Sequence, residues 1–146
     1  MTTGCKVVFA ANTSWYLWKF RAGTLMAFKA AGFEVICLAP QDAYSEKIVN
    51  DLGVQFHPLA IEGANRGAFV EFKSLVTAIR IIRRMRPNYV FNFTVKANIY
   101  CGLAANLLGI PFANNVSGLG TAFLHGGVLN QWVRKLYVWI NLKAAH

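Results

Sequence analysis

The chain has 146 residues, of which 55% are hydrophobic and only 14% are charged, and its net charge at pH 7 is +9. This length suits one domain with a sizeable core, and the apolar composition excludes a disordered chain. The excess of basic residues favours an anionic partner such as nucleic acid, an anionic membrane or a phosphorylated substrate.

The cysteines Cys5, Cys37 and Cys101 lie far apart in apolar surroundings and form no C-x-x-C pair. We expect reduced, packed thiols in a cytosolic setting and no metal site. The first residues lack the basic stretch followed by an apolar run that is typical of a signal peptide. No stretch reaches the roughly 18 apolar residues of a membrane span.

Short apolar runs alternate with helical patterns along the whole chain. Strands are predicted at residues 5–11, 33–39, 54–60, 89–94 and 110–116. Helices are predicted at residues 15–31, 44–52, 69–86, 96–108 and 128–144. Pro58 predicts that the third strand lies at an edge of the sheet. The alternation predicts an α/β fold, a Rossmann-like doubly wound parallel sheet with helices on both faces.

The first strand runs directly into a helix through Asn12, Thr13 and Ser14. Asn12 or Ser14 is predicted to cap this helix, whose free N–H groups and dipole would favour an anion by roughly 0.3–1 kcal/mol. The next residues are rich in aromatics, which favours either a platform for an acceptor sugar or lipid, or packing in the core. For Tyr16 and Phe20 we expect the core, and for Trp15 or Trp18 some exposure.

The helix at 69–86 has two contrasting faces. Phe72, Leu75, Ile79 and Ile82 are predicted to face the core. The opposite face is basic, which indicates a solvated surface or contact with anionic lipid at about 1 kcal/mol per cation; its residues are Lys73, Arg80, Arg83, Arg84 and Arg86. No nucleic-acid-binding module is recognisable. In the last helix, one predicted apolar face holds Leu129, Trp132, Val133, Leu136 and Ile140.

Residues 110–127, IPFANNVSGLGTAFLHGG, change from an apolar run to a loop rich in small and amide residues. Such a loop at the carboxyl end of a strand suits a sugar- or phosphate-binding cleft, or simply connects strand to helix. Lys96 lies at the start of the preceding helix, at the same edge of the sheet. Its charge would contact either a phosphate or only solvent. His125 lacks a carboxylate partner for a general base, and dehydrogenase and hydrolase motifs are absent.

Four segments carry a family resemblance: NTSWYLWKFR at 12–21, APQDAYSEKI at 39–48, FTVKANIY at 93–100 and NNVSGLGTAF at 114–123. With them the chain resembles the N-terminal half of a bacterial family-4 glycosyltransferase of the two-domain GT-B architecture, of the type that assembles capsule, O-antigen and related glycans on undecaprenyl diphosphate. The resemblance implies an acceptor-binding cleft lined by Asn12, Ser14, Trp15, Arg21, Lys96, Asn98, Ser117, Gly118, Gly120 and Thr121. Lys96 and Ser117 are its candidate catalytic residues, although many relatives have a histidine where Ser117 stands.

The resemblance further implies a transfer of a hexose or N-acetylhexosamine from a nucleotide-diphosphate sugar, without a metal or cofactor, at the inner face of the plasma membrane. Arg80, Arg83 and Arg84 would face the anionic membrane, and no nucleic acid is expected as a partner. The nucleotide-sugar domain is absent from residues 1–146, so we expect this single N-terminal domain to be inactive alone and to need that domain in cis or in trans. The alternatives are a non-catalytic membrane-surface subunit that recruits a donor-binding chain, or half of a GT-B-like nucleotide-sugar epimerase.

Overall fold

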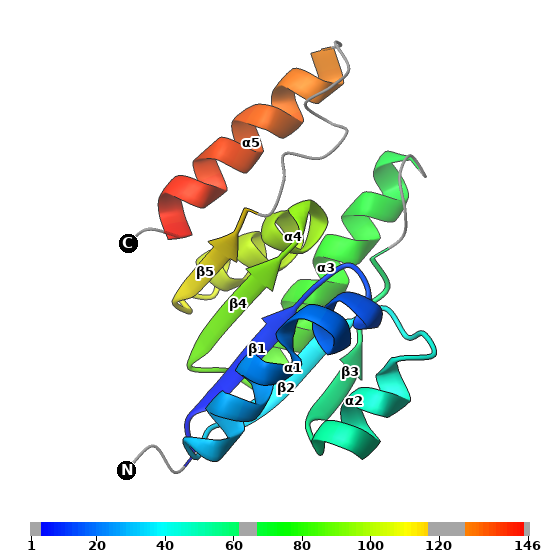
Figure 1. Cartoon of the computed structure of the whole chain (residues 1–146). Coiled ribbons are helices and arrows are strands. Elements are labelled where there is room, and N and C mark those ends of the chain that lie inside the picture. Colours follow the sequence, from blue (N-terminus) through cyan, green and yellow to red (C-terminus); the bar gives the residue numbers. More distant parts are fainter. Residues whose placement is uncertain (1–3, 62–66, 117–127, 145–146) are drawn as a thin grey trace.

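The computed structural model describes residues 4–61, 67–116 and 128–144, in which strands and helices alternate (Figure 1). The strands are β1 (Lys6–Ala10), β2 (Glu34–Ala39), β3 (Gln55–Pro58), β4 (Tyr89–Phe93) and β5 (Phe112–Asn115). The helices are α1 (Ser14–Ala30), α2 (Ser45–Leu52), α3 (Ala68–Met85), α4 (Val95–Leu107) and α5 (Val128–Ala144). Every predicted element is present, and the strands are slightly shorter than predicted.

The strands form one parallel sheet in the order β3-β2-β1-β4-β5. β1 is central, and its Val8 lies opposite Ile36 of β2 and Val90 of β4. β3 lies at one edge, as Pro58 predicts, because a proline has no N–H to donate to a further strand. The Rossmann-like doubly wound sheet is thereby confirmed.

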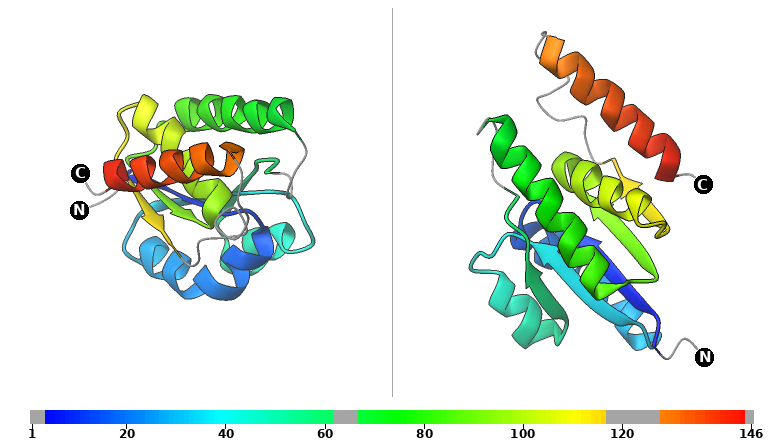
Figure 2. Two further views of the ribbon diagram at one scale, coloured as in Figure 1. Left: turned by 90° about the horizontal axis from the view of Figure 1, so that it is seen from above. Right: turned by 180° about the vertical axis from the view of Figure 1, so that it is seen from behind.

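Helices cover both faces of the sheet, with α1 and α2 on one side and α3, α4 and α5 on the other (Figure 2). Side chains of β1 alternate between the two layers, because successive residues of a strand point to opposite faces. Val8 packs among residues of α3, α4 and α5. Phe9 packs on the side of α1, where its ring stacks on Phe91 with centroids 5.0 Å apart and meets Phe28 edge-on at 5.3 Å.

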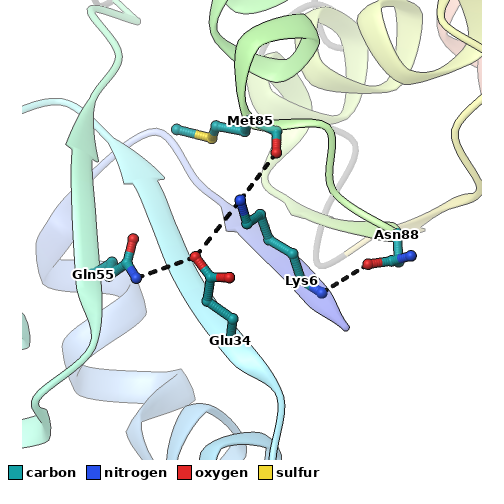
Figure 3. A network of polar contacts seen from close by, with 5 residues as sticks. All are labelled: Lys6, Glu34, Gln55, Met85 and Asn88. Atoms are coloured by element: carbon teal, nitrogen blue, oxygen red, sulfur yellow. Dashed lines mark hydrogen bonds and ion pairs between the residues drawn. The ribbon is translucent and has the colours of Figure 1, made fainter. Parts of the chain in front are cut away.

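A polar network ties the elements together at the amino edge of the sheet (Figure 3). Lys6 Nζ donates to the Met85 carbonyl at 3.2 Å and lies 3.6 Å from Glu34 Oε1. Gln55 donates to the same carboxylate, and the Lys6 backbone N–H donates to Asn88 Oδ1. The network therefore joins β1, β2 and β3 to the end of α3, at the edge opposite the strand ends where ligands of such sheets bind.

Gly102 allows the close packing of α4 that its small residues predict. A Cβ added there would lie 3.1 Å from Ile140 of α5 and 3.3 Å from Phe112 of β5. A side chain there would require the neighbouring side chains of α5 and β5 to shift by a few tenths of an ångström, so the glycine lets α4 pack closely on both.

Three predictions about packing are wrong. Phe20 is 56% exposed rather than buried, and Phe72 is 64% exposed, because the first turns of α3 project beyond the carboxyl edge of the sheet (Figure 1). In α5 the buried stripe passes through Tyr137 and Ile140, whereas Trp132 and Leu136 are exposed. The sequence pattern identifies the residues that share a helix face, but a neighbouring element must be present to cover that face.

Candidate functional site

The carboxyl ends of β1 and β4 are neighbours, although the chain leaves them in opposite directions, toward β2 and toward β5. In open α/β sheets such a topological switch point is where ligands bind. Asn12 follows β1 and Thr94 follows β4, and the Asn12 backbone N–H donates to Thr94 Oγ1 at 3.2 Å. We therefore centre the candidate site on these two residues and call it the switch point.

Thr94 has an unusual backbone conformation, with φ 79° and ψ 151°. This region is rarely adopted by a β-branched residue and costs roughly 1–3 kcal/mol. Strained residues of this kind cluster at functional sites. Sequence reasoning missed Thr94, because no local pattern signals a positive φ at a threonine.

The start of α1 differs from its prediction. Thr13, rather than Asn12 or Ser14, is the N-cap, and its Oγ1 accepts from the Tyr16 N–H at 3.1 Å. The N–H groups of Ser14 and Trp15 donate to Asp42 Oδ2 at 3.0 and 3.3 Å. A carboxylate of the chain itself thus occupies the helix N-terminus that the sequence suggested for a ligand anion.

The Ser14 side chain is also engaged inside the fold. It is fully buried, its Oγ donates to the Pro40 carbonyl at 2.6 Å, and it lies 3.1 Å from Ser45 Oγ. These contacts join α1 to the loop after β2 and to the start of α2. Ser14 therefore positions the loop that carries Asp42.

Arg21 reaches the end of β4 from the second turn of α1. Its guanidinium carbon lies 4.5 Å from the ring centroid of Phe93, and Nη2 donates to the Tyr16 hydroxyl at 2.9 Å. Its Nε is buried and without a hydrogen-bond partner, and no carboxylate among the described residues pairs with it. Trp15, 41% exposed, meets Phe20 edge-on nearby, with centroids 5.3 Å apart. The Tyr16 ring lies 5.4 Å from Phe20 and thereby joins Arg21 to the two exposed rings of α1.

A small hollow of about 170 Å³ lies at the ends of β4 and β5. Its lining residues are Phe91, Asn92, Phe93, Ala113, Asn114 and Asn115. Phe93 lines this hollow and also carries the Arg21 guanidinium. Rings and carboxamides around a hollow suit a sugar or another polar group with an apolar face.

Lys96 is the second residue of α4, and its Nζ pairs with Glu71 Oε1 of α3 at 2.8 Å. The two side chains keep 27% and 34% of their surface exposed. The predicted cation is thus near the switch point, but a carboxylate already neutralises it. Glu71 was not expected at this edge, because it lies 25 residues earlier in the chain.

Asn98 is fully buried and belongs to a network that links four elements. Its Nδ2 donates to the Asn115 carbonyl and to the Tyr137 hydroxyl, both at 3.1 Å. Asn92 Nδ2 donates to Asn114 Oδ1 at 2.9 Å. The carboxamide oxygens of Asn92 and Asn98 are buried without a donor. Asn98 therefore holds the end of β5 and the helix α5 in place.

The remaining predicted residues, Ser117, Gly118, Gly120 and Thr121, lie outside the described residues, as does His125. Among the residues that are described, no group of three or more His, Cys, Asp or Glu side chains could hold a metal ion. Burial raises the pKa of the Cys37 and Cys101 thiols to about 12, which makes them poor nucleophiles. Each helix in the described ranges is too short or too polar to span a bilayer.

Residues 6–146 match the family model described as "Glycosyl transferase 4-like". One relative, from Neisseria meningitidis serogroup C, is named UDP-N-acetylglucosamine–N-acetylmuramyl-(pentapeptide) pyrophosphoryl-undecaprenol N-acetylglucosamine transferase. It is 30% identical over 122 residues, which cover 75% of this chain and 33% of the relative. The N,N'-diacetylbacillosaminyl-diphospho-undecaprenol alpha-1,3-N-acetylgalactosaminyltransferase of Campylobacter jejuni is 25% identical over 130 residues, 88% of this chain and 34% of that protein.

This chain thus spans about a third of the length of the curated relatives it matches. Among solved structures, the UDP-GlcNAc 2-epimerase of Neisseria meningitidis bound to UDP-GlcNAc superposes with a TM-score of 0.63 at 16% identity. The match covers 92% of this chain and 38% of the epimerase. At that identity the superposition shows a shared fold and nothing about activity.

Proposed function

Because this chain belongs to the glycosyl transferase 4-like family, we propose that it supplies the acceptor-binding side of a glycosyltransferase. The proposed reaction moves a hexose or an N-acetylhexosamine from a nucleotide-diphosphate sugar to a lipid-linked saccharide. One observation carries the choice of acceptor. The names of both relatives specify saccharides that are joined to undecaprenol through a diphosphate, although the saccharides themselves differ. The carrier is therefore the shared feature that this chain is proposed to recognise.

Arg21 is the cation best placed to meet the acceptor diphosphate. Lys96 is held by Glu71, and the N-terminus of α1 is occupied by Asp42, so neither offers an unopposed positive charge. Arg21 instead rests on aromatic rings and a hydroxyl, beside the hollow at the ends of β4 and β5. A guanidinium suits phosphate because its fork of N–H donors can form two parallel hydrogen bonds.

The saccharide of the acceptor would lie along the switch point. Asn12 and Trp15 are exposed there, and an indole face packs well on a sugar ring. The nearby carboxylates Asp42 and Glu71 are both engaged, the first by backbone N–H groups and the second by Lys96. We therefore assign to this chain the binding and orientation of the acceptor, while the donor sugar is bound by a second domain, in cis or in trans. Such an enzyme would work at the inner face of the plasma membrane.

Calorimetric titration of the full chain tests the assignment. Undecaprenyl diphosphate in detergent micelles is expected to bind, with empty micelles as the blank, whereas UDP-N-acetylglucosamine is expected to show no micromolar affinity. Arg21→Ala should weaken the lipid affinity roughly tenfold or more, since a hydrogen bond to a charged group contributes about 1.5–3 kcal/mol. The exposed Lys19 lies on the same helix, and Lys19→Ala is the matched control. Unchanged affinity in Arg21→Ala would refute the role of the guanidinium.

The epimerase alternative rests on the shared fold with an enzyme that binds UDP-GlcNAc. The epimerase alternative predicts the opposite outcome of the same titration: UDP-N-acetylglucosamine binds and undecaprenyl diphosphate does not. The non-catalytic alternative agrees with lipid binding but predicts that the recruited donor-binding chain transfers the sugar to the acceptor even without this chain. Both alternatives are thus separated from the proposal by measured outcomes.

A further inference from the structure

The hollow at the ends of β4 and β5 takes its side chains from one face of the sheet. In the register of the two strands, Phe91 lies opposite Ala113 and Phe93 lies opposite Asn115. Because side chains alternate along a strand, these four share a face, which is the α1 side where Phe91 and Phe93 pack. The other face of β5 carries Phe112, which packs with residues of α4 and α5. The hollow is therefore lined by two rings, a methyl group and a carboxamide.

The carboxamide of Asn115 is the polar side chain that the hollow offers to a ligand. Asn92 and Asn114 also line the hollow, but their carboxamides lie on the opposite face and bond to each other at 2.9 Å. The Asn115 side chain is exposed and forms no hydrogen bond with the described residues. Its main-chain carbonyl accepts from Asn98 Nδ2 at 3.1 Å. The backbone of Asn115 is thus held in place while its carboxamide stays available.

The size of the hollow suits a substituent of a sugar rather than a whole sugar. Its volume of about 170 Å³ equals that of about five or six water molecules at roughly 30 Å³ each. A hexose has more non-hydrogen atoms than this space admits. A small group such as an acetamido group fits.

The chemistry of the lining favours a neutral amide among such small groups. The lining residues carry no charge, and a carboxylate buried there without a cation would lose its hydration uncompensated. A hydroxyl group has no apolar part to place on Phe93 and Ala113. An acetamido group has a methyl for these apolar residues, and its N–H and carbonyl match the acceptor and donor of a carboxamide such as Asn115.

We propose that this hollow binds the acetamido group of the acceptor's first sugar, the one joined to the diphosphate. The inference rests on the proposed function, in which Arg21 binds that diphosphate. Phe93 adjoins both sites, because its ring lies 4.5 Å from the guanidinium carbon and also lines the hollow. In a 2-acetamido sugar the acetamido group is on the carbon next to the one that bears the phosphate. Both groups of one ligand therefore reach the two adjacent sites together, and the acceptor class narrows to 2-acetamido sugars.

Calorimetric titration of the full chain with two acceptors in detergent micelles tests the inference. Undecaprenyl-diphosphate N-acetylglucosamine should bind about tenfold more tightly than undecaprenyl-diphosphate glucose, because the acetamido group adds a buried methyl and a hydrogen bond. Ala113→Val fills the hollow and should remove this preference. Asn115→Ala keeps the apolar lining and should leave a preference of about threefold, the part due to the methyl group. Both variants should bind undecaprenyl diphosphate itself like the wild type.

Val116→Ala is the matched control, because Val116 is exposed and follows Asn115 directly but does not line the hollow. It should keep the full preference, and circular dichroism checks that all variants remain folded. The inference is overturned if the wild type binds the two acceptors equally, or if either hollow variant keeps the full preference. The proposed function is judged separately. A wild type that binds undecaprenyl diphosphate but does not distinguish the sugars refutes only the acetamido site, whereas one that binds none of the three lipids refutes both.

Discussion

Replacing Asp42 tests whether a carboxylate of the chain itself caps the N-terminus of α1. Its two oxygens accept three backbone hydrogen bonds, from Ser14, Trp15 and Tyr44, at 3.0, 3.3 and 2.7 Å. Asp42→Ala leaves these N–H groups to water. The carboxylate also lies at the positive end of a helix of 17 residues. The variant therefore loses both a cap and a favourable charge–dipole interaction.

The expected cost follows from these contacts. Loss of a side-chain cap costs about 0.5–2 kcal/mol, and loss of an anion at a helix N-terminus costs about 0.3–1 kcal/mol. Because Asp42 is half-buried, we expect Asp42→Ala to lower the free energy of unfolding by about 2 kcal/mol. Asp42→Asn keeps an acceptor oxygen but not the charge, and should lose about 1 kcal/mol.

Urea unfolding followed by tryptophan fluorescence and circular dichroism measures both variants. Asp51→Ala is the control, since Asp51 is an exposed acid on α2 and should change stability by less than about 0.5 kcal/mol. Sulfate should stabilise Asp42→Ala more than the wild type, because the vacated N–H groups then accept an external anion. The reasoning fails if Asp42→Ala unfolds at the wild-type urea concentration, or if sulfate stabilises both proteins equally.

Three further predictions concern stability. Thr94→Gly should raise the free energy of unfolding by about 1 kcal/mol in urea, because relief of the strained backbone outweighs the lost hydrogen bond to Asn12; a loss of stability would show that the hydrogen bond dominates. Tyr137→Phe should cost about 1–2 kcal/mol and speed hydrogen exchange in α5, because a buried N–H of Asn98 loses its acceptor; unchanged exchange would contradict this. The free energy of unfolding should fall as the pH rises from 9 toward 12, because burial raises the pKa of the Cys37 and Cys101 thiols from 9.0 to about 12 and the unfolded thiols ionise first. In the variant with both cysteines changed to alanine, a slope as steep as in the wild type would assign the pH dependence to other groups.

The order and type of the elements follow from local signals in the sequence. Apolar runs of strand length end at Pro40 or run into polar residues, and helices end at Gly32, Gly53 and Gly109, which adopt φ of 88°, 58° and 66°. Glycine adopts a positive φ at little cost in free energy. The positions of glycines in the sequence therefore indicate where helices end. These local signals were therefore enough to predict the order and type of the elements, and with them the fold class.

The site was only partly predictable, because its contacts join residues that are distant in sequence. Asp42 lies 28 residues from Ser14, and Tyr137 lies 39 residues from Asn98. A periodic pattern in the sequence does not indicate which side chains of two different elements will be in contact. The N-cap was misassigned for a related reason: Asn12, Thr13 and Ser14 are all good caps, and the backbone geometry alone selects Thr13.

The Lys6 network has a consequence for how the chain folds. Lys6 and Asn88, which pair beside the starts of β1 and β4, are 82 residues apart. At about 5–20 residues per second, a ribosome needs about 4–16 s to deliver β4 after β1. During that interval one side of the central strand β1 has no partner, and only β2 can pair with its other side. Slow synthesis of residues 7–89 should therefore favour aggregation of nascent chains, and a chaperone that binds extended apolar segments should raise the yield of folded protein.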